Sequence, residues 1–264
     1  MSDYQEIYLP DLKLSGRFMK KGTGDPLVYL HGVFGARIWS PFLEDLSKKY
    51  TVYAPLQPGF EDVDGLEKLD DVIDLALYYL TLIDALGLDK VKLVGHFLGG
   101  MAALEIASLS FHYIEKMVLI SPLGFWKDNI PVKDIFIMNE QEQIDSIWHD
   151  QKHPSVEYLF PKEESEIEKT NRIAEQKNDM IGAAKFLWPI PERGLIRRIY
   201  RVKNPVLLIW GESDKIISPE YAEEFSSRLK ECRQITLPKS GHLPMLEQPE
   251  ALSCNVLDFF NKEI

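Results

Sequence analysis

The chain has few of the features that mark disulfide-rich, membrane-spanning or nucleic-acid-binding proteins. Two cysteines in 264 residues, Cys232 and Cys254, are too few for a disulfide framework, so we expect a reducing compartment. No run of ~18 apolar residues occurs, and no transmembrane helix is expected. Acidic residues outnumber basic ones by 41 to 30, and the net charge of −11 argues against a nucleic-acid or anionic-membrane partner.

The chain also lacks targeting and metal-binding patterns. Residues 1–6 carry neither the basic stretch nor the apolar stretch of a secretory signal, which favours a cytoplasmic protein. Three histidines, His112, His149 and His153, are expected to be exposed, and no spacing among them suggests a metal site. We therefore expect no metal.

What the chain does contain is the pattern of one large α/β domain with an insertion, or at most of two small domains. Its 264 residues are 45% hydrophobic, enough for a sizeable core. Continuous apolar runs alternate with amphipathic helical patterns such as residues 69–86. This order predicts a mostly parallel, doubly wound sheet with helices on both faces. The expected strands are a hairpin in residues 5–21 and the runs 27–30, 51–54, 91–94, 117–120, 205–210 and 233–237.

The α/β alternation stops after the sixth expected strand. Residues 124–201 contain no strand-like run, and prolines separate their helical patterns. We therefore predict an α/β core formed by residues 1–123 and 202–264, with residues 124–201 inserted as a helical cap. The expected helices of this cap are residues 132–148, 164–187 and 194–200.

The most informative stretch is residues 91–107. A buried strand, a glycine-flanked corner and a helical pattern follow one another here. A nucleophile elbow, Gly-x-Ser-x-Gly, needs this strand–turn–helix context. Gly95 and Gly99 fit the motif, but Phe97 occupies its middle position, where the serine would stand.

Other chemically informative residues follow the ends of the remaining strands. In an open parallel sheet, functional groups gather just beyond the carboxyl ends of the strands. An acid and a histidine follow the elbow in the order Asp214, then His242, as in α/β-hydrolases. The features found at strand ends are His31-Gly32, Phe97, Ser121-Pro122, Asp214 and His242.

From His31-Gly32 to Gly241-His242, the chain resembles the α/β-hydrolases, in particular small carboxylesterases and meta-cleavage-product (C–C bond) hydrolases with a helical cap. The resemblance implies the α/β-hydrolase fold, no cofactor, and a small, largely apolar ester, acyl or carbonyl ligand. It implies that Asp214 is the acid and His242 the base. It also implies that the backbone N–H groups of Val33 and Leu98 face the oxyanion, where such donors are worth ~3–4 kcal/mol.

Three further residues are candidates for the ligand pocket. His31 either lines the pocket or shapes its loop. Trp126 and Trp188 either line a pocket beneath the cap or serve ordinary packing between cap and core. A homodimer through an exposed face of the cap is also left open.

Two departures from the family pattern bear on the chemistry. The Phe97 side chain has no lone pair to attack a carbonyl and no proton for His242 to take. Relatives usually have Asp where Leu56 stands and Gly where Glu61 stands, in a loop that borders the same site. Both departures favour relaxed or redirected chemistry.

Phe97 is expected to keep the strained elbow conformation. A positive φ at a bulky residue costs roughly 1–3 kcal/mol. We predict that Gly95, Gly99 and helix packing enforce this conformation, and that the ring fills the base of the pocket beside His242. A negative φ at Phe97 would contradict this prediction.

Three hypotheses for function follow. In the first, the protein binds a small acyl or carbonyl ligand without serine-based hydrolysis. In the second, His242 and Asp214 act as a general base without a covalent intermediate. In the third, Phe97 was introduced by engineering into a working serine hydrolase. Ser121 or Ser240 could act as a substitute nucleophile, but neither lies on an elbow.

Overall fold

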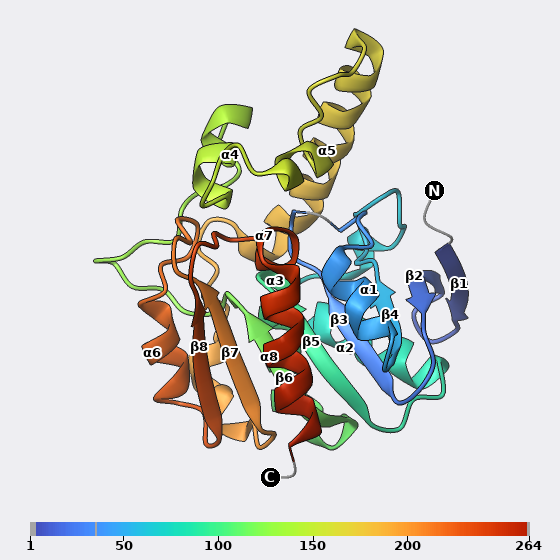
Figure 1. The fold of residues 1–264 in the computed structure, drawn as a ribbon. Helices are drawn as coiled ribbons and strands as arrows, with labels where there is room; N and C mark the ends of the chain where they lie inside the picture. Colours follow the sequence, from blue (N-terminus) through green and yellow to red (C-terminus); the bar gives the residue numbers. More distant parts are fainter. Residues whose placement is uncertain (1–3, 35, 263–264) are drawn as a thin grey trace.

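The computed structural model describes residues 4–34 and 36–262. Its centre is an eight-stranded sheet with the strand order β1-β2-β4-β3-β5-β6-β7-β8 (Figure 1). The hairpin β1–β2 is antiparallel and pairs antiparallel with β4, whereas all other neighbours are parallel. The predicted mostly parallel sheet is therefore confirmed. Its strands are β1 (Tyr4–Leu9), β2 (Leu14–Lys21), β3 (Pro26–Leu30), β4 (Thr51–Pro55), β5 (Val91–His96), β6 (Ile114–Ile120), β7 (Val206–Gly211) and β8 (Cys232–Leu237).

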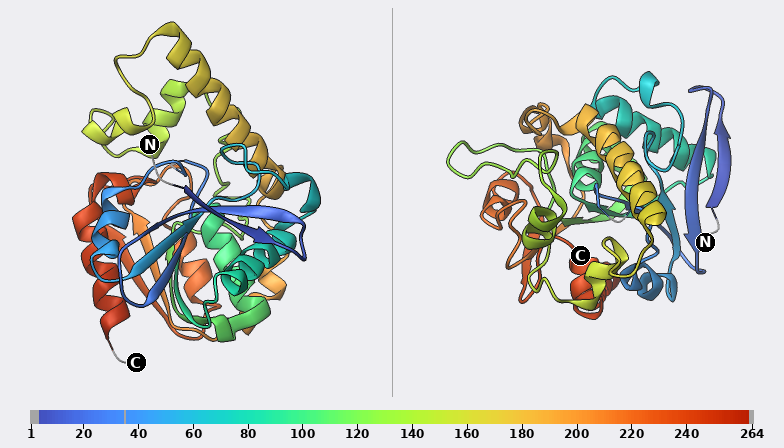
Figure 2. Two further views of the ribbon diagram at one scale, coloured as in Figure 1. Left: turned by 90° about the vertical axis from the view of Figure 1, so that its right-hand side faces the viewer. Right: turned by 90° about the horizontal axis from the view of Figure 1, so that it is seen from above.

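Helices cover both faces of the sheet, which explains why its central strands are apolar on both sides. All six residues of β5 and all six of β7 are buried. Helices α1 and α8 pack together on one face, and α2 and α3 pack together on the other (Figure 2, left). The helices of the core are α1 (Pro41–Ser47), α2 (Val72–Ala85), α3 (Leu98–Ser110), α6 (Tyr221–Ser226), α7 (Pro244–Glu247) and α8 (Pro249–Asn261), with 3₁₀ turns η1 (Leu66–Lys68) and η2 (Phe111–Tyr113).

Residues 124–201, which we call the insertion, follow β6 and contain helices but no strand within the described chain. Seen from above, α5 lies across the core (Figure 2, right). None of the helices in residues 4–34 and 36–262 is long and apolar enough to span a membrane. The elements of the insertion are α4 (Glu140–Ile147), η3 (Pro154–Tyr158), α5 (Glu166–Leu187), η4 (Leu195–Arg197) and η5 (Ile199–Arg201).

Two helices expected in the insertion differ from the prediction. The helix predicted for residues 132–148 begins only at Glu140, because Asn139 and Glu142 form a capping box that starts it there. The segment predicted as a helix over residues 194–200 forms the two short turns η4 and η5 instead. The long helix expected over 164–187 is confirmed as α5.

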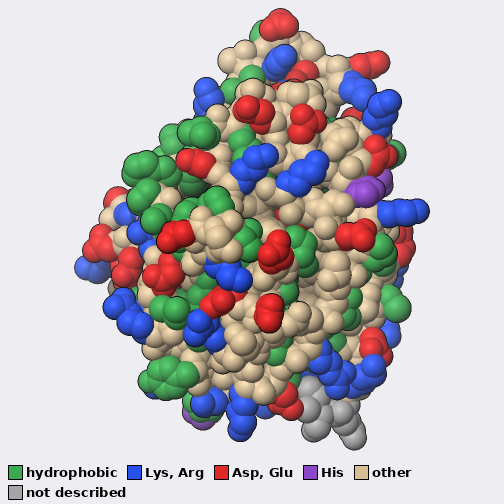
Figure 3. All heavy atoms as spheres, turned by 90° about the vertical axis from the view of Figure 1, so that its left-hand side faces the viewer, with side chains coloured by type: hydrophobic (Ala, Val, Ile, Leu, Met, Phe, Trp, Pro, Cys, Tyr) green, Lys and Arg blue, Asp and Glu red, His purple; other side chains and the backbone are tan. Residues whose placement is uncertain are grey.

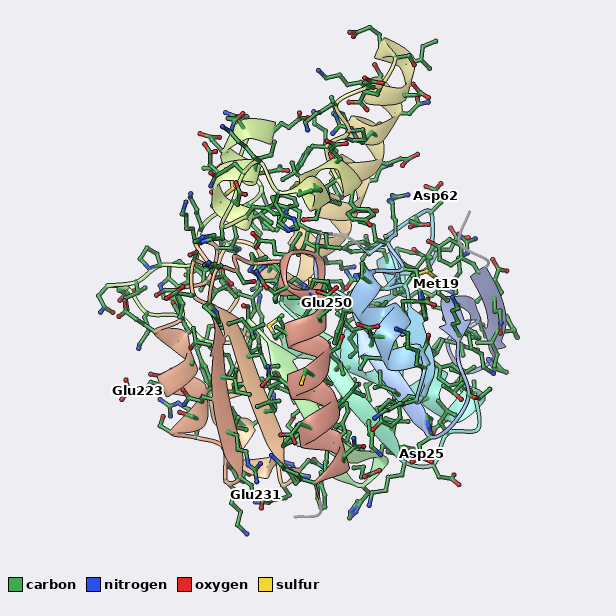
Figure 4. The ribbon with its side chains drawn as sticks, in the orientation of Figure 1. Met19, Asp25, Asp62, Glu223, Glu231 and Glu250 are labelled. Atoms are coloured by element: carbon green, nitrogen blue, oxygen red, sulfur yellow. The ribbon has the colours of Figure 1, made fainter. Side chains whose placement is uncertain are left out.

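The insertion lies above the carboxyl ends of the strands. Asp25 directly precedes β3 and Glu231 directly precedes β8, and both lie at the lower end of the molecule in Figure 4. Asp62, in the loop after β4, and Glu250, at the start of α8, lie nearer the insertion. Residues that follow the strands therefore face the insertion, at the edge where a parallel sheet holds its functional groups.

Candidate active site

Phe97 forms the sharp corner between β5 and α3. Its backbone has φ +53° and ψ −110°, which confirms the predicted positive φ. Gly99 enforces the corner, because a Cβ there would lie 2.1 Å from the Leu30 carbonyl oxygen. The Phe97 N–H donates to the Ile120 carbonyl oxygen at 3.0 Å, which ties the corner to β6. These contacts hold a conformation that costs about 1–3 kcal/mol, although the corner carries no nucleophile.

Asp214 and His242 form a fully buried hydrogen-bonded pair. One carboxylate oxygen of Asp214 accepts from His242 Nδ1 at 2.9 Å. The other accepts from the backbone N–H groups of Ile216 and Ile217 at 2.9 and 3.0 Å. Because an ionised carboxylate only accepts, Nδ1 carries the proton. His242 Nε2 has no hydrogen-bond partner among the described residues, so it is the free position of the pair.

Glu247 supports the loop that carries His242, a role that the sequence did not reveal. Its buried carboxylate accepts from the Gly241 N–H at 2.6 Å and from the His149 N–H at 2.8 Å. Burial raises the pKa of Glu247, and its hydrogen bonds to backbone N–H groups oppose that rise. The His242 N–H donates to the Ile147 carbonyl oxygen at 2.6 Å. The insertion therefore helps to position the histidine.

Besides the His96 ring, two phenyl rings pack against the His242 imidazole. The Phe97 ring lies 4.7 Å away, centroid to centroid, at an interplanar angle of 88°. The Phe34 ring lies 6.4 Å away at 89°. The His242 side chain is 0% exposed, so the base is enclosed in this structure. The sequence-based expectation that the Phe97 ring lies beside His242 is confirmed.

The expected oxyanion groups lie close to this enclosed site. A Cβ at Gly32 would lie 3.0 Å from the Phe97 Cβ, so the loop that carries Val33 passes directly over the elbow. Within the described part of the chain, neither the Val33 N–H nor the Leu98 N–H donates a hydrogen bond. Neither donor is thus engaged by another described group.

His31 and His96 have structural roles. The His31 Nε2 accepts from the Gln57 N–H at 3.1 Å, so Nδ1 donates to the Gly32 carbonyl oxygen at 2.7 Å. Burial lowers the pKa of His31 to about 4, which keeps the ring neutral. The His96 Nε2 donates to the His242 carbonyl oxygen at 3.0 Å, and burial, followed by repulsion from His242, lowers the pKa of His96 well below its usual value.

The structure does not support the two serines as substitute nucleophiles. Ser121 and Ser240 are both buried, and the hydroxyl of each has no hydrogen-bond partner among the described residues. Neither hydroxyl therefore donates to His242 Nε2, the contact that would activate it.

Two cavities lie between the core and the insertion. The first, which we call the Phe97 cavity, has a volume of about 170 Å³, and Trp126 and Trp188 line it as proposed from the sequence. The second, the Val33 cavity, has a volume of about 210 Å³. His31 lines neither, because its ring is turned toward Gln57. The other residues of the Phe97 cavity are Leu123, Val132, Lys133, Asp134, Ile135, Phe136, Leu187, Pro189 and Pro191.

Apolar side chains continue from the Phe97 cavity onto the surface. They gather in the upper half of the face toward which residues 124–138 project (Figure 3). Ile137 is 80% exposed, Trp188 56% and Ile190 41%. The mouth of this cavity is therefore suited to apolar rather than charged compounds.

The loop that contains the second departure is tied to α5. The backbone of Glu61 has φ +46°, a conformation that favours the glycine found in relatives. Its N–H donates to Asp179 on α5 at 3.2 Å, and Arg37 donates two hydrogen bonds to the same carboxylate at 3.1 and 2.9 Å. Burial raises the pKa of Asp179, and its bonds to Arg37 oppose that rise. The sequence did not reveal this link, because Arg37 and Asp179 are 142 residues apart.

Relatives with known names match nearly the whole chain. It is 26% identical over 263 residues to a 2-hydroxy-6-oxo-6-phenylhexa-2,4-dienoate hydrolase of Burkholderia cepacia, covering 90% of this chain and 88% of the relative. It is 26% identical over 257 residues to a protein of Bacillus subtilis named as an uncharacterised carboxylesterase, covering 90% of this chain and 80% of the relative.

Solved structures and a family model give the same assignment of the fold. A meta-cleavage product hydrolase of Pseudomonas fluorescens superposes with a TM-score of 0.80 at 20% identity, covering 97% of both chains. Naproxen esterase of Bacillus subtilis superposes with a TM-score of 0.76 at 20% identity, covering 98% of this chain and 92% of the esterase. The family model described as "alpha/beta hydrolase fold" matches residues 25–249. The chain therefore belongs to the α/β-hydrolase family.

Proposed function

We propose that this protein binds a small, largely apolar acyl or carbonyl compound in the Phe97 cavity and does not hydrolyse it through an acyl-enzyme. The observation that carries this proposal is the position of Phe97. It occupies the elbow corner with φ +53°, and its ring packs against the base at 4.7 Å. A side chain without a lone pair cannot attack a carbonyl carbon, and His242 has no proton to take from it.

The surroundings of the Phe97 cavity support a binding function. The cavity is lined largely by apolar and aromatic side chains, as small-molecule sites usually are. Its charged lining residues are already engaged: Lys133 bonds to Ser146 Oγ at 2.6 Å, and Asp134 accepts from the Phe136 N–H at 3.0 Å. The names of two relatives, a dienoate hydrolase and a carboxylesterase, describe enzymes whose substrates carry a carbonyl group.

We also propose that residues 124–201 act as a cap over this ligand. Two separate parts of the insertion contribute to the cavity, Trp126 near its start and Leu187 and Trp188 at the C-terminal end of α5. A ligand in the cavity would therefore contact core and insertion together, and binding would favour their closed arrangement.

A second candidate function is general-base catalysis by His242 with Asp214. The free Nε2 favours it, since an oriented imidazole with an unshared electron pair can accept a proton from a substrate or a water. This chemistry requires the Phe97 ring to move, because His242 is 0% exposed. The binding function requires no such movement, and it is therefore our first proposal.

Ester hydrolysis and ligand binding together test these proposals. Rates with p-nitrophenyl acetate and butyrate would be measured for the unmodified chain, for Phe97→Ser and for His242→Ala, and binding of the non-hydrolysable ketone butanone by calorimetry. We expect butanone binding without turnover in the unmodified chain, and turnover in Phe97→Ser. Turnover in the unmodified chain that His242→Ala abolishes would favour the second candidate. The absence of both binding and turnover in every variant would contradict the proposal.

A further inference from the structure

The two cavities between core and insertion are neighbours that remain separate. The residues that line the Phe97 cavity and those that line the Val33 cavity have no member in common. The same helix, α5, covers both: Met180 contacts the Val33 cavity and Leu187 the Phe97 cavity. Seven residues of helix separate these two positions, a distance of about 10 Å. Side chains that lie between the two cavities must therefore divide the space between α5 and the core.

Three aromatic rings stand at that position. Phe97 lines one cavity, Phe34 lines the other, and His242 packs edge-to-face against both. All three side chains are buried, with exposed fractions of 1%, 9% and 0% respectively. The loop between Gly32 and Phe34 passes over the elbow, since a Cβ at Gly32 would meet the Phe97 Cβ at 3.0 Å. We call these three residues the aromatic wall.

We infer that the aromatic wall limits the length of the ligand, and that Phe97 is the residue that sets this limit. This inference rests on the proposed binding function and narrows its ligand to short compounds that fit the Phe97 cavity alone. The two cavities measure about 170 and 210 Å³, and each is below the ~300 Å³ at which sites for drug-sized ligands begin. Joined, they would accept a longer ligand that runs beneath α5 toward Met180.

Phe97 is the member of the wall that can be removed with the least effect on the rest. His242 is held by Asp214 and by the Ile147 carbonyl oxygen. Phe34 lies on the loop that carries Val33. The Phe97 side chain makes no hydrogen bond, so its truncation removes volume without leaving a polar group unpaired. In a family whose elbow normally holds a small serine, a ring at this position divides the cleft.

A series of linear methyl ketones, from butanone to dodecanone, tests the limit by calorimetry. In the unmodified chain we expect affinity to rise by about fourfold per methylene until the Phe97 cavity is full, and then to stop rising or fall. In Phe97→Ala the rise is expected to continue to longer ketones. Phe97→Leu removes less volume and is expected to extend the rise by fewer carbons.

A second substitution shows whether the added chain enters the Val33 cavity. Met180→Trp fills that cavity from α5 and is expected to leave every ketone affinity of the unmodified chain unchanged. In the Phe97→Ala, Met180→Trp double variant, the higher affinity of Phe97→Ala for long ketones is expected to be lost. Substitutions at positions 97 and 180 can affect each other in this way only if the two cavities are joined. Phe136→Ala is the matched control: it enlarges the Phe97 cavity away from the wall, and its affinities should not respond to Met180→Trp.

The outcomes separate the wall from the binding function. If affinity depends on ketone length in the same way in the unmodified chain and in Phe97→Ala, the aromatic wall does not limit ligand length. The proposed binding function would still hold. If no ketone binds any variant, the binding function fails, and xenon-pressurised crystals of both proteins still test the wall. Xenon between the two cavities only in Phe97→Ala would support the wall, since dry apolar cavities bind xenon. Xenon in one continuous cavity of the unmodified chain would overturn it.

Discussion

The two sides of the candidate site are held in place by different means. On the acid–histidine side, hydrogen bonds hold every group: three reach the Asp214 carboxylate, and Glu247 accepts from the loop that carries His242. On the elbow side, packing and a strained backbone hold Phe97, which has no polar side-chain atom. The comparison indicates that the geometry of the elbow depends on the surrounding glycines and strands and not on the nucleophile.

This difference has a consequence for function. The Asp214–His242 pair has a free Nε2 that can accept a proton. The Phe97 side chain at the elbow has no hydroxyl proton to give to it. Under the function that we propose, the site differs from a complete Ser-His-Asp arrangement at one side chain. Experiments on the acid–histidine side should produce larger effects than experiments on the loops that only shape the site.

The largest effect is expected from removing the acid in a chain that can react. In the Phe97→Ser background, Asp214→Asn should lower kcat for p-nitrophenyl butyrate about 10⁴-fold, because the amide no longer holds His242 in the productive tautomer. Steady-state kinetics would measure the change. Asp258→Asn, at an exposed carboxylate on α8, is the control and should leave kcat unchanged. Equal rates for the two double variants would show that Asp214 has only a structural role.

The next effect concerns the support of the His242 loop. Glu247→Ala leaves the N–H groups of Gly241 and His149 without acceptors and should cost about 3 kcal/mol of unfolding free energy in urea. Glu247→Gln keeps one acceptor oxygen and should cost about 1–2 kcal/mol. Glu250→Ala, at an exposed position of α8, should change stability by less than about 0.5 kcal/mol. A Glu247→Ala chain as stable as the Glu250→Ala chain would refute the role of Glu247.

On the elbow side, His31 makes stability depend on pH. Burial lowers its pKa from 6.5 to about 4, so between these values the unfolded chain binds more protons than the folded one. Stability should therefore fall as pH falls from about 6.5 to about 4, by about 3 kcal/mol from this group. Urea titrations of His31→Asn across this range should show a shallower slope than the unmodified chain. Replacement of the exposed His112 by Asn should leave the slope unchanged.

The smallest effect is expected from the hydrogen bonds between Arg37, in the loop after Val33, and Asp179 on α5. Arg37→Gln removes two hydrogen bonds to Asp179 and should cost about 1–2 kcal/mol. Lys48→Gln, which removes an exposed ion pair with Asp45, should cost less than about 0.5 kcal/mol. Thermal melts would compare the two variants. If they melt at the same temperature, the tie between loop and insertion contributes no more than an ordinary surface pair.

Most of the fold could be predicted because its signals are local. Continuous apolar runs predicted the buried strands, and glycines at 95 and 99 predicted the corner that the structure has at Phe97. Residues 132–139 are the first part of the segment that the sequence predicts as a helix over 132–148. In the structure these residues precede α4 and line the Phe97 cavity, so their apolar pattern reflects a pocket and not a helix face.

The parts of the site that could not be predicted depend on contacts between distant residues. Glu247 is a single carboxylate in a four-residue helix that is otherwise apolar, and its spacing gives no signal of the two N–H groups it accepts from. The division of the cleft likewise requires the positions of Phe34 and His242 in space, 208 residues apart in the chain. Asp214 and His242 could be identified only because each follows a strand end in the order that the family motif requires.

The most direct test of the claim that the site lacks only its nucleophile is covalent labelling with a fluorophosphonate, followed by intact mass spectrometry. Phe97→Ser should gain one phosphonyl group per chain, since Asp214 and His242 already form a hydrogen-bonded pair and we propose that the N–H groups of Val33 and Leu98 form the oxyanion hole. The unmodified chain and the Phe97→Ser, His242→Ala double variant should gain none. Labelling of the unmodified chain, or no labelling of a folded Phe97→Ser chain, would contradict the claim.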